Sequence, residues 1–186
     1  MTRIIAGQAG GRRIATPAGD DTRPTTDRVR EALFSVLESQ LGGWSDVRVL
    51  DLFAGSGALG LEALSRGAAH ATFVEQDRRT ADVVRRNIAT LGLAGATVVA
   101  APAARAVARL DGAFDVVFMD PPYAFGDDEL TGVQAALGDR GAIAADGIVV
   151  VERSKRSGEP VWAGGLEATR HKTYGSTTLW YGRRHA

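Results

Sequence analysis

Short apolar runs alternate with segments of helical spacing along this chain, and this alternation restricts its fold more than any other feature. The runs that predict strands cover residues 48–53, 70–75, 97–101, 114–120 and 147–152. The segments that predict the intervening helices cover residues 58–65, 78–91, 105–110 and 127–137. Strands that alternate with helices form a parallel sheet with helices on both faces. The sequence therefore predicts an α/β protein with a doubly wound, Rossmann-like sheet, followed by a terminal antiparallel pair at residues 166–174 and 177–182.

The chain before the first of these strands predicts a small extension. Residues 3–16 alternate apolar and basic side chains around a Gly-Gly pair, as a short hairpin does. A helix is expected from Arg28 to about Leu41, with a capping side chain just before it and glycines after it. We therefore expect residues 1–42 to form a hairpin and helix extension, and residues 43–186 to form the main domain.

The amino-acid composition excludes several kinds of functional site. The chain has 186 residues, enough for one domain with a real core, and 45% hydrophobic and 24% charged content is ordinary for a globular protein. It has no Cys, which excludes disulfides, thiolate zinc sites and a cysteine nucleophile. Three His and no clustered acidic pairs predict no dedicated metal site. No apolar run approaches a membrane span or a signal peptide, so a cytoplasmic location without a membrane partner is expected.

Charge is unevenly distributed along a chain whose formal net charge is zero. Residues 1–30 hold six Arg and three Asp, residues 31–152 have an acidic surplus, and residues 153–186 hold seven basic and two acidic residues. Two basic terminal segments around an acidic middle indicate a shared anionic partner, and nucleic acid is the natural candidate. The candidates for contact with RNA phosphates are Arg12, Arg13, Arg23, Arg28 and Arg30.

The loop after the first predicted strand has the spacing of a cofactor site. Gly55 and Gly57 allow a tight turn and a close approach of the backbone to a ligand, and with Gly60 they match the dinucleotide fingerprint G-x-G-x-x-G. Glu75 ends the second strand, where an acidic residue can accept hydrogen bonds from a ribose diol. On these residues alone, a nicotinamide or flavin enzyme competes with a methyltransferase.

Asp51 favours the methyl donor S-adenosylmethionine. A carboxylate beside the glycine turn repels a pyrophosphate but attracts the ammonium and sulfonium charges of this donor. A charge-assisted hydrogen bond of that kind contributes roughly 1.5–3 kcal/mol. The expected donor-binding residues are Asp51, Phe53, Ala54, Gly55, Ser56, Gly57, Glu75, Gln76 and Ala103.

The tetrapeptide Asp120-Pro121-Pro122-Tyr123 follows the apolar run 114–119 and is the predicted catalytic loop. Its prolines fix the turn and remove two N–H donors, so the loop presents a carboxylate, carbonyls and an aromatic face. Such a loop can hold a planar group that bears an NH2. It resembles the [DNS]PP[YFW] motif of S-adenosylmethionine-dependent methyltransferases that act on exocyclic amines.

Over nearly its whole length the chain resembles the RsmD family of ribosomal RNA guanine-N2 methyltransferases. The matching blocks are residues 3–14, 23–34, 51–60 and 118–123, of which RPTTDRVREALF at 23–34 is the most specific. The resemblance implies a class I methyltransferase sheet, methylation of a guanine N2 in 16S ribosomal RNA, and ribosomal RNA or an assembling small subunit as partner. Many relatives carry Asp or Asn after the third strand, whereas residues 100–104 here are apolar, so adenine is expected to be read by backbone groups and packing.

The predicted chemistry assigns distinct roles to the catalytic loop. Asp120 and the Pro121 carbonyl accept hydrogen bonds from the amine, and Tyr123 stacks on an extruded base. The alternatives are methylation of a DNA adenine or cytosine amine or of a protein glutamine amide, and a non-catalytic RNA-binding assembly factor. The presence of Asp51 and Glu75 beside an intact tetrapeptide argues against the assembly factor.

Overall fold

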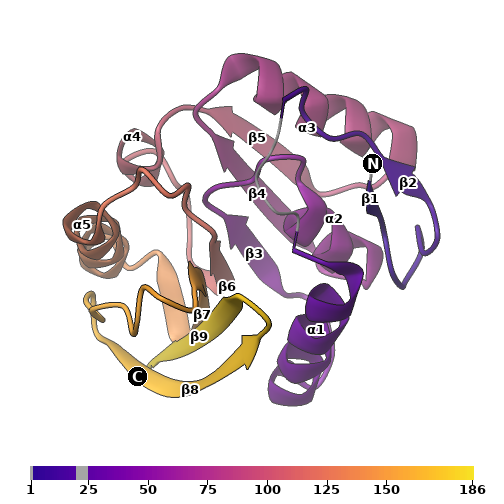
Figure 1. Ribbon diagram of the computed structural model, residues 1–186. Coiled ribbons are helices and arrows are strands. Elements are labelled where there is room, and N and C mark those ends of the chain that lie inside the picture. The colour runs from indigo at the N-terminus through magenta and orange to yellow at the C-terminus, as the bar shows by residue number, and fades with distance from the viewer. Residues whose placement is uncertain (1, 20–24) are drawn as a thin grey trace.

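The computed structural model describes residues 2–19 and 25–186, and its centre is a seven-stranded sheet (Figure 1). The strand order is β5-β4-β3-β6-β7-β9-β8, with parallel pairing from β5 to β7 and antiparallel pairing of β9 with its two neighbours. The strands are β3 Arg48–Asp51, β4 His70–Glu75, β5 Ala96–Ala100, β6 Phe114–Met119, β7 Ile143–Ser154, β8 Leu166–Tyr174 and β9 Thr177–Arg184. The terminal antiparallel pair thus extends the main sheet.

Helices cover both faces of this sheet, as predicted for a doubly wound fold (Figure 1). They are α1 Asp27–Leu41, α2 Ala58–Ser65, α3 Arg78–Leu91, α4 Ala103–Val107 and α5 Asp127–Asp139. Apolar side chains of α1, α2 and α3 form one core with the sheet, and those of α4 and α5 form the other. None of these helices in the described residues is both long and apolar enough to cross a membrane.

The N-terminal extension packs against the sheet. Strand β1, Thr2–Arg3, pairs antiparallel with β2, Arg13–Ile14, which confirms the predicted hairpin. Helix α1 begins after Thr26, whose side chain accepts a hydrogen bond from the Val29 amide, and it ends at Gly42. Phe34 of α1 lies 5.8 Å from Phe118 of β6, measured between ring centroids. The extension therefore shares one hydrophobic core with the seven-stranded sheet.

Most predicted bounds lie within two residues of the observed ones, and two elements differ by more than that at one end. The helix expected at 105–110 begins two residues earlier, because Pro102, with φ near −57°, sets the backbone for a helix that starts at Ala103. The strand expected at 147–152 begins at Ile143, and its pairing with β6 is irregular near its start. Residues 144–147 form this irregular part, which hid the early start of the strand from its apolar pattern.

The strand order reverses between β3 and β6. The chain passes from β3 to β4 and β5 on one side, then returns to place β6 and β7 on the other side. Loops that leave the carboxyl ends of β3 and β6 therefore diverge and leave a crevice between them, which is where doubly wound proteins bind their ligands.

Candidate active site

A cavity of about 1210 Å³ opens at the carboxyl ends of the parallel strands. Its walls come from the loops after β3, β4 and β6, which the sequence predicted, and from residues 16–19 and the end of β7, which it did not. The predicted residues that line it are Asp51, Phe53, Ala54, Gly55, Ser56, Glu75, Gln76, Ala103, Asp120, Pro121, Pro122 and Tyr123. The structure thus brings the predicted donor and catalytic residues together in one place.

Gly57 lies outside this lining, unlike the other predicted donor residues. It precedes α2 with φ 86°, and a Cβ here would come 3.2 Å from the Val84 side chain. At Gly60 a Cβ would come 2.4 Å from the Phe73 ring, which no real side chain tolerates. Gly60 therefore allows α2 to pack closely against Phe73 of β4, and Gly57 has little space for a side chain beside Val84 of α3.

Asp51 is a buried carboxyl group at the end of β3. Its side chain is 1% exposed, and Oδ2 accepts a hydrogen bond from the Gly60 amide at 3.2 Å. Burial raises the pKa of Asp51 to about 7, the negative charge of Glu75 adds to the rise, and the Gly60 hydrogen bond opposes it. Asp51 forms no ion pair with any residue that the structure describes. Such a group favours a ligand that brings a positive charge.

Glu75 is held in a fixed orientation by two backbone amides. Oε2 accepts a hydrogen bond from Gly55 at 3.0 Å, and Oε1 accepts one from Asp77 at 3.0 Å. Each carboxylate oxygen keeps a second lone-pair direction, so the side chain can also accept hydroxyl donors from a ligand. Glu75 therefore serves two purposes, since it braces the loop after β3 and presents acceptors to the cavity.

The apolar wall expected beyond β5 is present. Pro102, Ala103 and Ala104 all line the cavity, and Ala103 is buried as the first residue of α4. These residues offer a flat apolar surface with backbone groups, which suits an aromatic ring.

An aromatic contact joins the predicted catalytic loop after β6 to the loop after β3. The Phe125 amide donates a hydrogen bond to the Pro122 carbonyl at 2.9 Å, which closes the turn of the tetrapeptide. The Phe125 ring meets Phe53 edge to face, with centroids 5.0 Å apart. Asp120 is half-buried, whereas Tyr123 is 83% exposed, an unusual position for a large aromatic side chain. The loop thus presents Tyr123 to solvent while its base is fixed.

Acidic residues form a row across the sheet. Four adjacent parallel strands carry an acidic residue near their carboxyl ends, namely Asp51, Glu75, Asp120 and Glu152, the last of which directly follows the final residue of β7 that pairs with β6. The residues two positions before them all belong to the core beneath α1, α2 and α3, namely Val49, Phe73, Phe118 and Val150. Because side chains alternate between faces, the four acids share that face. No group of three or more His, Cys, Asp or Glu that could hold a metal occurs in the described residues.

Glu152 is a member of this row that the sequence analysis missed. It lines the cavity, and its Oε2 accepts a hydrogen bond from the Thr25 hydroxyl at 2.8 Å. The signal that could have revealed it is the one that revealed Asp51 and Asp120, an acidic residue directly after a buried apolar run.

The five arginines predicted to contact RNA have different surroundings. Arg13 and Arg28 are exposed. Arg12 is also exposed, and its guanidinium donates hydrogen bonds to the carbonyls of Thr90 and Leu91 at the end of α3. Arg23 lies outside the described residues. The fifth, Arg30, has a structural position that corrects its predicted role.

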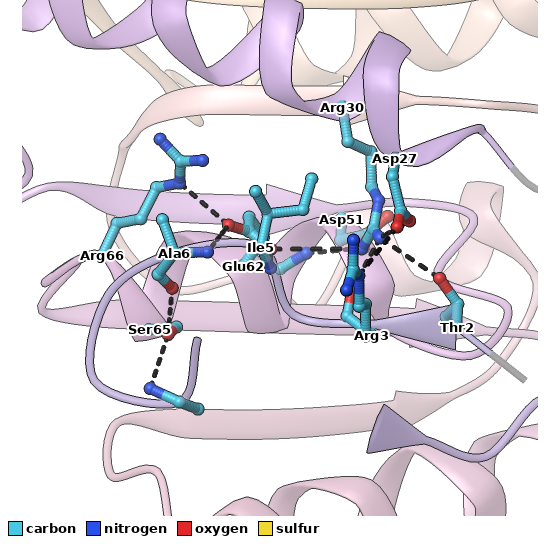
Figure 2. A network of polar contacts seen from close by, with 12 residues as sticks. Thr2, Arg3, Ile5, Ala6, Asp27, Arg30, Asp51, Glu62, Ser65 and Arg66 are labelled. Carbon is cyan, nitrogen blue, oxygen red and sulfur yellow. Dashed lines mark hydrogen bonds and ion pairs between the residues drawn. The ribbon is translucent and has the colours of Figure 1, made fainter. Parts of the chain in front are cut away.

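Arg30 is buried, with 1% of its surface exposed, so it is not a phosphate contact. Its Nη2 donates hydrogen bonds to Thr2 Oγ1, the Arg3 carbonyl and Asp27 Oδ1 at 3.1, 2.6 and 2.8 Å (Figure 2). Its Nη1 lies 4.0 Å from Glu62 Oε2. The guanidinium therefore joins β1, α1 and α2, and it has no charge to offer at the surface.

Glu62 is the other centre of this network (Figure 2). It is fully buried in α2 and accepts hydrogen bonds from the amides of Ile5 and Ala6 at 2.8 and 3.0 Å, and from Arg66 Nε at 2.9 Å. Ser65, one turn away, donates to the Ala6 carbonyl and accepts from the Ala9 amide. Helix α2 therefore anchors the N-terminal extension. This helix directly follows the glycine-rich loop, residues 52–57, after β3.

Comparison with known proteins identifies the family of this chain. The model of the family described as "Conserved hypothetical protein 95" matches residues 2–183. Ribosomal RNA small subunit methyltransferase D of Escherichia coli K12 is 40% identical over 184 residues, which are 99% of this chain and 90% of that protein. The solved structure of yhhF from Escherichia coli superposes with a TM-score of 0.87 at 38% identity and covers 99% of this chain and 98% of that one. A solved Thermus thermophilus protein, TTHA0928, gives 0.79 at 32% identity over the full length of both.

These matches extend over both the N-terminal extension and the sheet, so they include the whole site and its supporting network. The fold is a Rossmann-like methyltransferase fold, and the cavity holds the expected acidic and aromatic residues. This chain therefore belongs to the RsmD family of methyltransferases.

Proposed function

We propose that this protein uses S-adenosylmethionine to methylate the exocyclic N2 amine of a guanine in 16S ribosomal RNA. The observation that carries the proposal is the single cavity in which Asp51 and Glu75 lie on one side of the tetrapeptide Asp120–Tyr123. The name of the Escherichia coli relative supports ribosomal RNA of the small subunit as the substrate class.

The residues present fit the donor. Asp51, a buried carboxyl group without a cationic partner among the described residues, suits the donor's ammonium group. Glu75 retains acceptor capacity for the ribose hydroxyls, and residues 102–104 offer an apolar wall to the adenine ring. When bound, S-adenosylmethionine supplies an electrophilic methyl group on a sulfonium centre.

The chain's own residues act on the amine. The Asp120 carboxylate and the Pro121 carbonyl accept hydrogen bonds from the NH2 group and so hold its nitrogen in one orientation. Guanine N2 is a weak nucleophile because its lone pair is delocalised into the ring. Acceptors that bind the NH2 hydrogens favour a pyramidal nitrogen and stabilise the positive charge that develops there. Asp120 then accepts the proton that the amine loses.

Other residues of the chain contact the target base and the RNA phosphates. Tyr123, exposed beside the cavity, stacks on a base that has left its helix or loop. Arg12, Arg13 and Arg28 of the extension, residues 1–42, contact phosphates. The roles of these residues follow from their exposure and charge, because backbone phosphates supply most of the affinity for nucleic acid.

Methyl transfer from a labelled donor tests the proposal. The substrates are naked 16S ribosomal RNA, small subunits that lack the modification, and duplex DNA, offered side by side. We expect label in the RNA or the subunits as N2-methylguanine after digestion. Label in DNA adenine or cytosine would replace the proposed substrate, and calorimetric binding of NAD without binding of S-adenosylhomocysteine would refute the donor.

A further inference from the structure

Glu152 lies next to the predicted catalytic loop, residues 120–123. It lies in β7, next to β6, and the last paired residues of these strands are Met119 and Val151. Asp120 and Glu152 each follow those residues by one position, so they are neighbours across the sheet. Both line the same cavity. Glu152 therefore lies beside the group that is proposed to bind the amine.

The order of strands divides the cavity into two sides. Asp51 and Glu75 end β3 and β4 on one side of β6, whereas Glu152 belongs to β7 on the opposite side. The first side suits the methyl donor, as argued above. Glu152 is thus separated from the donor side by the catalytic loop, and it faces the space that remains for the base.

Nearby groups hold the Glu152 side chain in place. The Thr25 hydroxyl donates to Oε2 at 2.8 Å, while Oε1 accepts no hydrogen bond from the described part of the chain. Burial raises the pKa of Glu152, and the Thr25 hydrogen bond opposes the rise. A half-buried carboxylate with one oxygen still able to accept is well placed to bind a hydrogen-bond donor of a ligand. If a ligand filled the site without offering such a donor, the unpaired carboxylate oxygen would cost binding free energy.

Guanine carries a suitable donor directly beside its N2 amine. Its Watson–Crick edge presents N2–H and N1–H side by side, both as donors, and then the O6 acceptor. 2-Aminopurine retains the 2-amine but has an acceptor lone pair at N1, which a carboxylate repels. We infer that Glu152 accepts a hydrogen bond from N1–H of the target guanine and determines specificity for that base, an inference that rests on the proposed function.

The test compares guanine with 2-aminopurine. Wild-type methylation of unmodified small-subunit RNA first locates the methylated nucleotide. Ligated RNA is then made with guanine or 2-aminopurine at that position, and it is reconstituted into particles where particles are the substrate. Glu152→Gln places an amide N–H where the carboxylate was, and this group can donate to N1 of 2-aminopurine. We expect kcat/KM for guanine to fall about 10- to 100-fold, as for the loss of a hydrogen bond to a charged group, with 2-aminopurine now preferred over guanine.

Three further variants distinguish specificity from support of the fold. Glu152→Asp keeps a carboxylate and should keep the preference for guanine at a lower rate. Thr25→Val removes the hydrogen bond to Glu152 and should also keep that preference. Glu167→Gln is the matched control, since its side chain is exposed in β8, far along the sheet from the catalytic loop, and it should resemble wild type. Calorimetry with S-adenosylhomocysteine confirms that each variant retains a folded donor site.

Each outcome separates the inference from the proposed function. If the wild-type protein methylates no guanine, the proposed function itself fails. If it methylates guanine and Glu152→Gln retains both rate and preference, Glu152 does not read the base. If Glu152→Gln lowers kcat/KM equally for guanine and 2-aminopurine, Glu152 only supports Thr25, and the inference is also overturned.

Discussion

The guanidinium of Arg30 and the carboxylate of Glu62 are both buried, and Nη1 of the first lies 4.0 Å from Oε2 of the second. Removal of the cation leaves Glu62 charged in the protein interior with less compensation. We expect Arg30→Met to lower the free energy of unfolding by about 3–5 kcal/mol, the usual cost of breaking a buried ion pair from one side. Urea unfolding monitored by circular dichroism measures this. Arg28→Met, on the exposed side of the same helix, is the control and should be nearly neutral.

Asp120→Ala should lower the rate without weakening donor binding. The carboxylate is proposed to act where positive charge develops on the amine, and it follows β6, whereas the proposed donor-binding residues Asp51 and Glu75 end β3 and β4. Loss of such a preorganised group typically costs on the order of 10²–10³ in kcat. Single-turnover kinetics give the rate, and calorimetry with S-adenosylhomocysteine gives the affinity. A purified variant with normal turnover would remove this loop from the mechanism.

Glu75→Ala should weaken the binding of S-adenosylmethionine. The substitution removes the acceptors proposed for the ribose and also frees the Gly55 amide that Glu75 braces. We expect the dissociation constant to rise about 10-fold or more, since a charge-assisted hydrogen bond contributes roughly 1.5–3 kcal/mol. Asp82→Ala, in the exposed part of α3, is the control. An unchanged dissociation constant would place the ribose elsewhere.

Donor affinity should depend on pH through Asp51. The donor's ammonium binds the ionised carboxylate, so below the pKa of about 7 binding must release a proton and affinity should rise with pH. Calorimetry at pH 6 in buffers of different ionisation enthalpy should show this release, and Asp51→Asn should abolish it.

The same group affects stability with the opposite sign. Between its unfolded pKa of 3.8 and its folded pKa of about 7, the folded state binds more protons than the unfolded state. The contribution of Asp51 to the free energy of unfolding therefore falls as pH rises through this window. If Asp51→Asn leaves the pH dependence of unfolding unchanged, the assigned pKa is wrong.

Charge removal at Arg13 and Arg28 should weaken RNA binding and reduce its dependence on salt. Each lost phosphate contact should flatten the slope of log affinity against log salt concentration by about one unit. Arg109→Ala, exposed just beyond α4 on the opposite side of the sheet, is the control. Filter binding at several salt concentrations measures the slope, and the donor's dissociation constant should not move. An unaltered slope would shift the RNA surface to the basic segment 153–184.

Local patterns were sufficient to predict most of the fold and most of the residues that meet in the cavity. The strand 70–75 and the helices at 58–65 and 78–91 have the predicted bounds, because each combines a clear apolar period with a glycine or polar stop. Asp51 and Asp120 were found for the same reason, since both follow a buried run. The apolar periods, their stops and the acidic residues that follow them are each contained in a short stretch of the sequence.

The misplaced residues depend on partners far away in the sequence. The prediction that Arg30 contacts an RNA phosphate is wrong, and its spacing to Leu33, Phe34 and Leu37 in fact puts it on the apolar face of α1. In the interior it finds Asp27 on its own helix and also Thr2, the Arg3 carbonyl and Glu62, which are distant in the sequence and which no local pattern reveals. The donor-binding role predicted for Gly57 stays a prediction, although Gly57 lies outside the cavity lining.

The core that α1 shares with the sheet has a consequence for target choice. Because α1 packs on β6 in this core, the distance between Arg28 and Asp120 is set by the fold. Under the proposed function, the extension binds the RNA at this fixed distance from Asp120. The base that reacts is the one that lies at the right distance from the bound phosphates, and a guanine of identical sequence context on an RNA of different shape is left unmethylated.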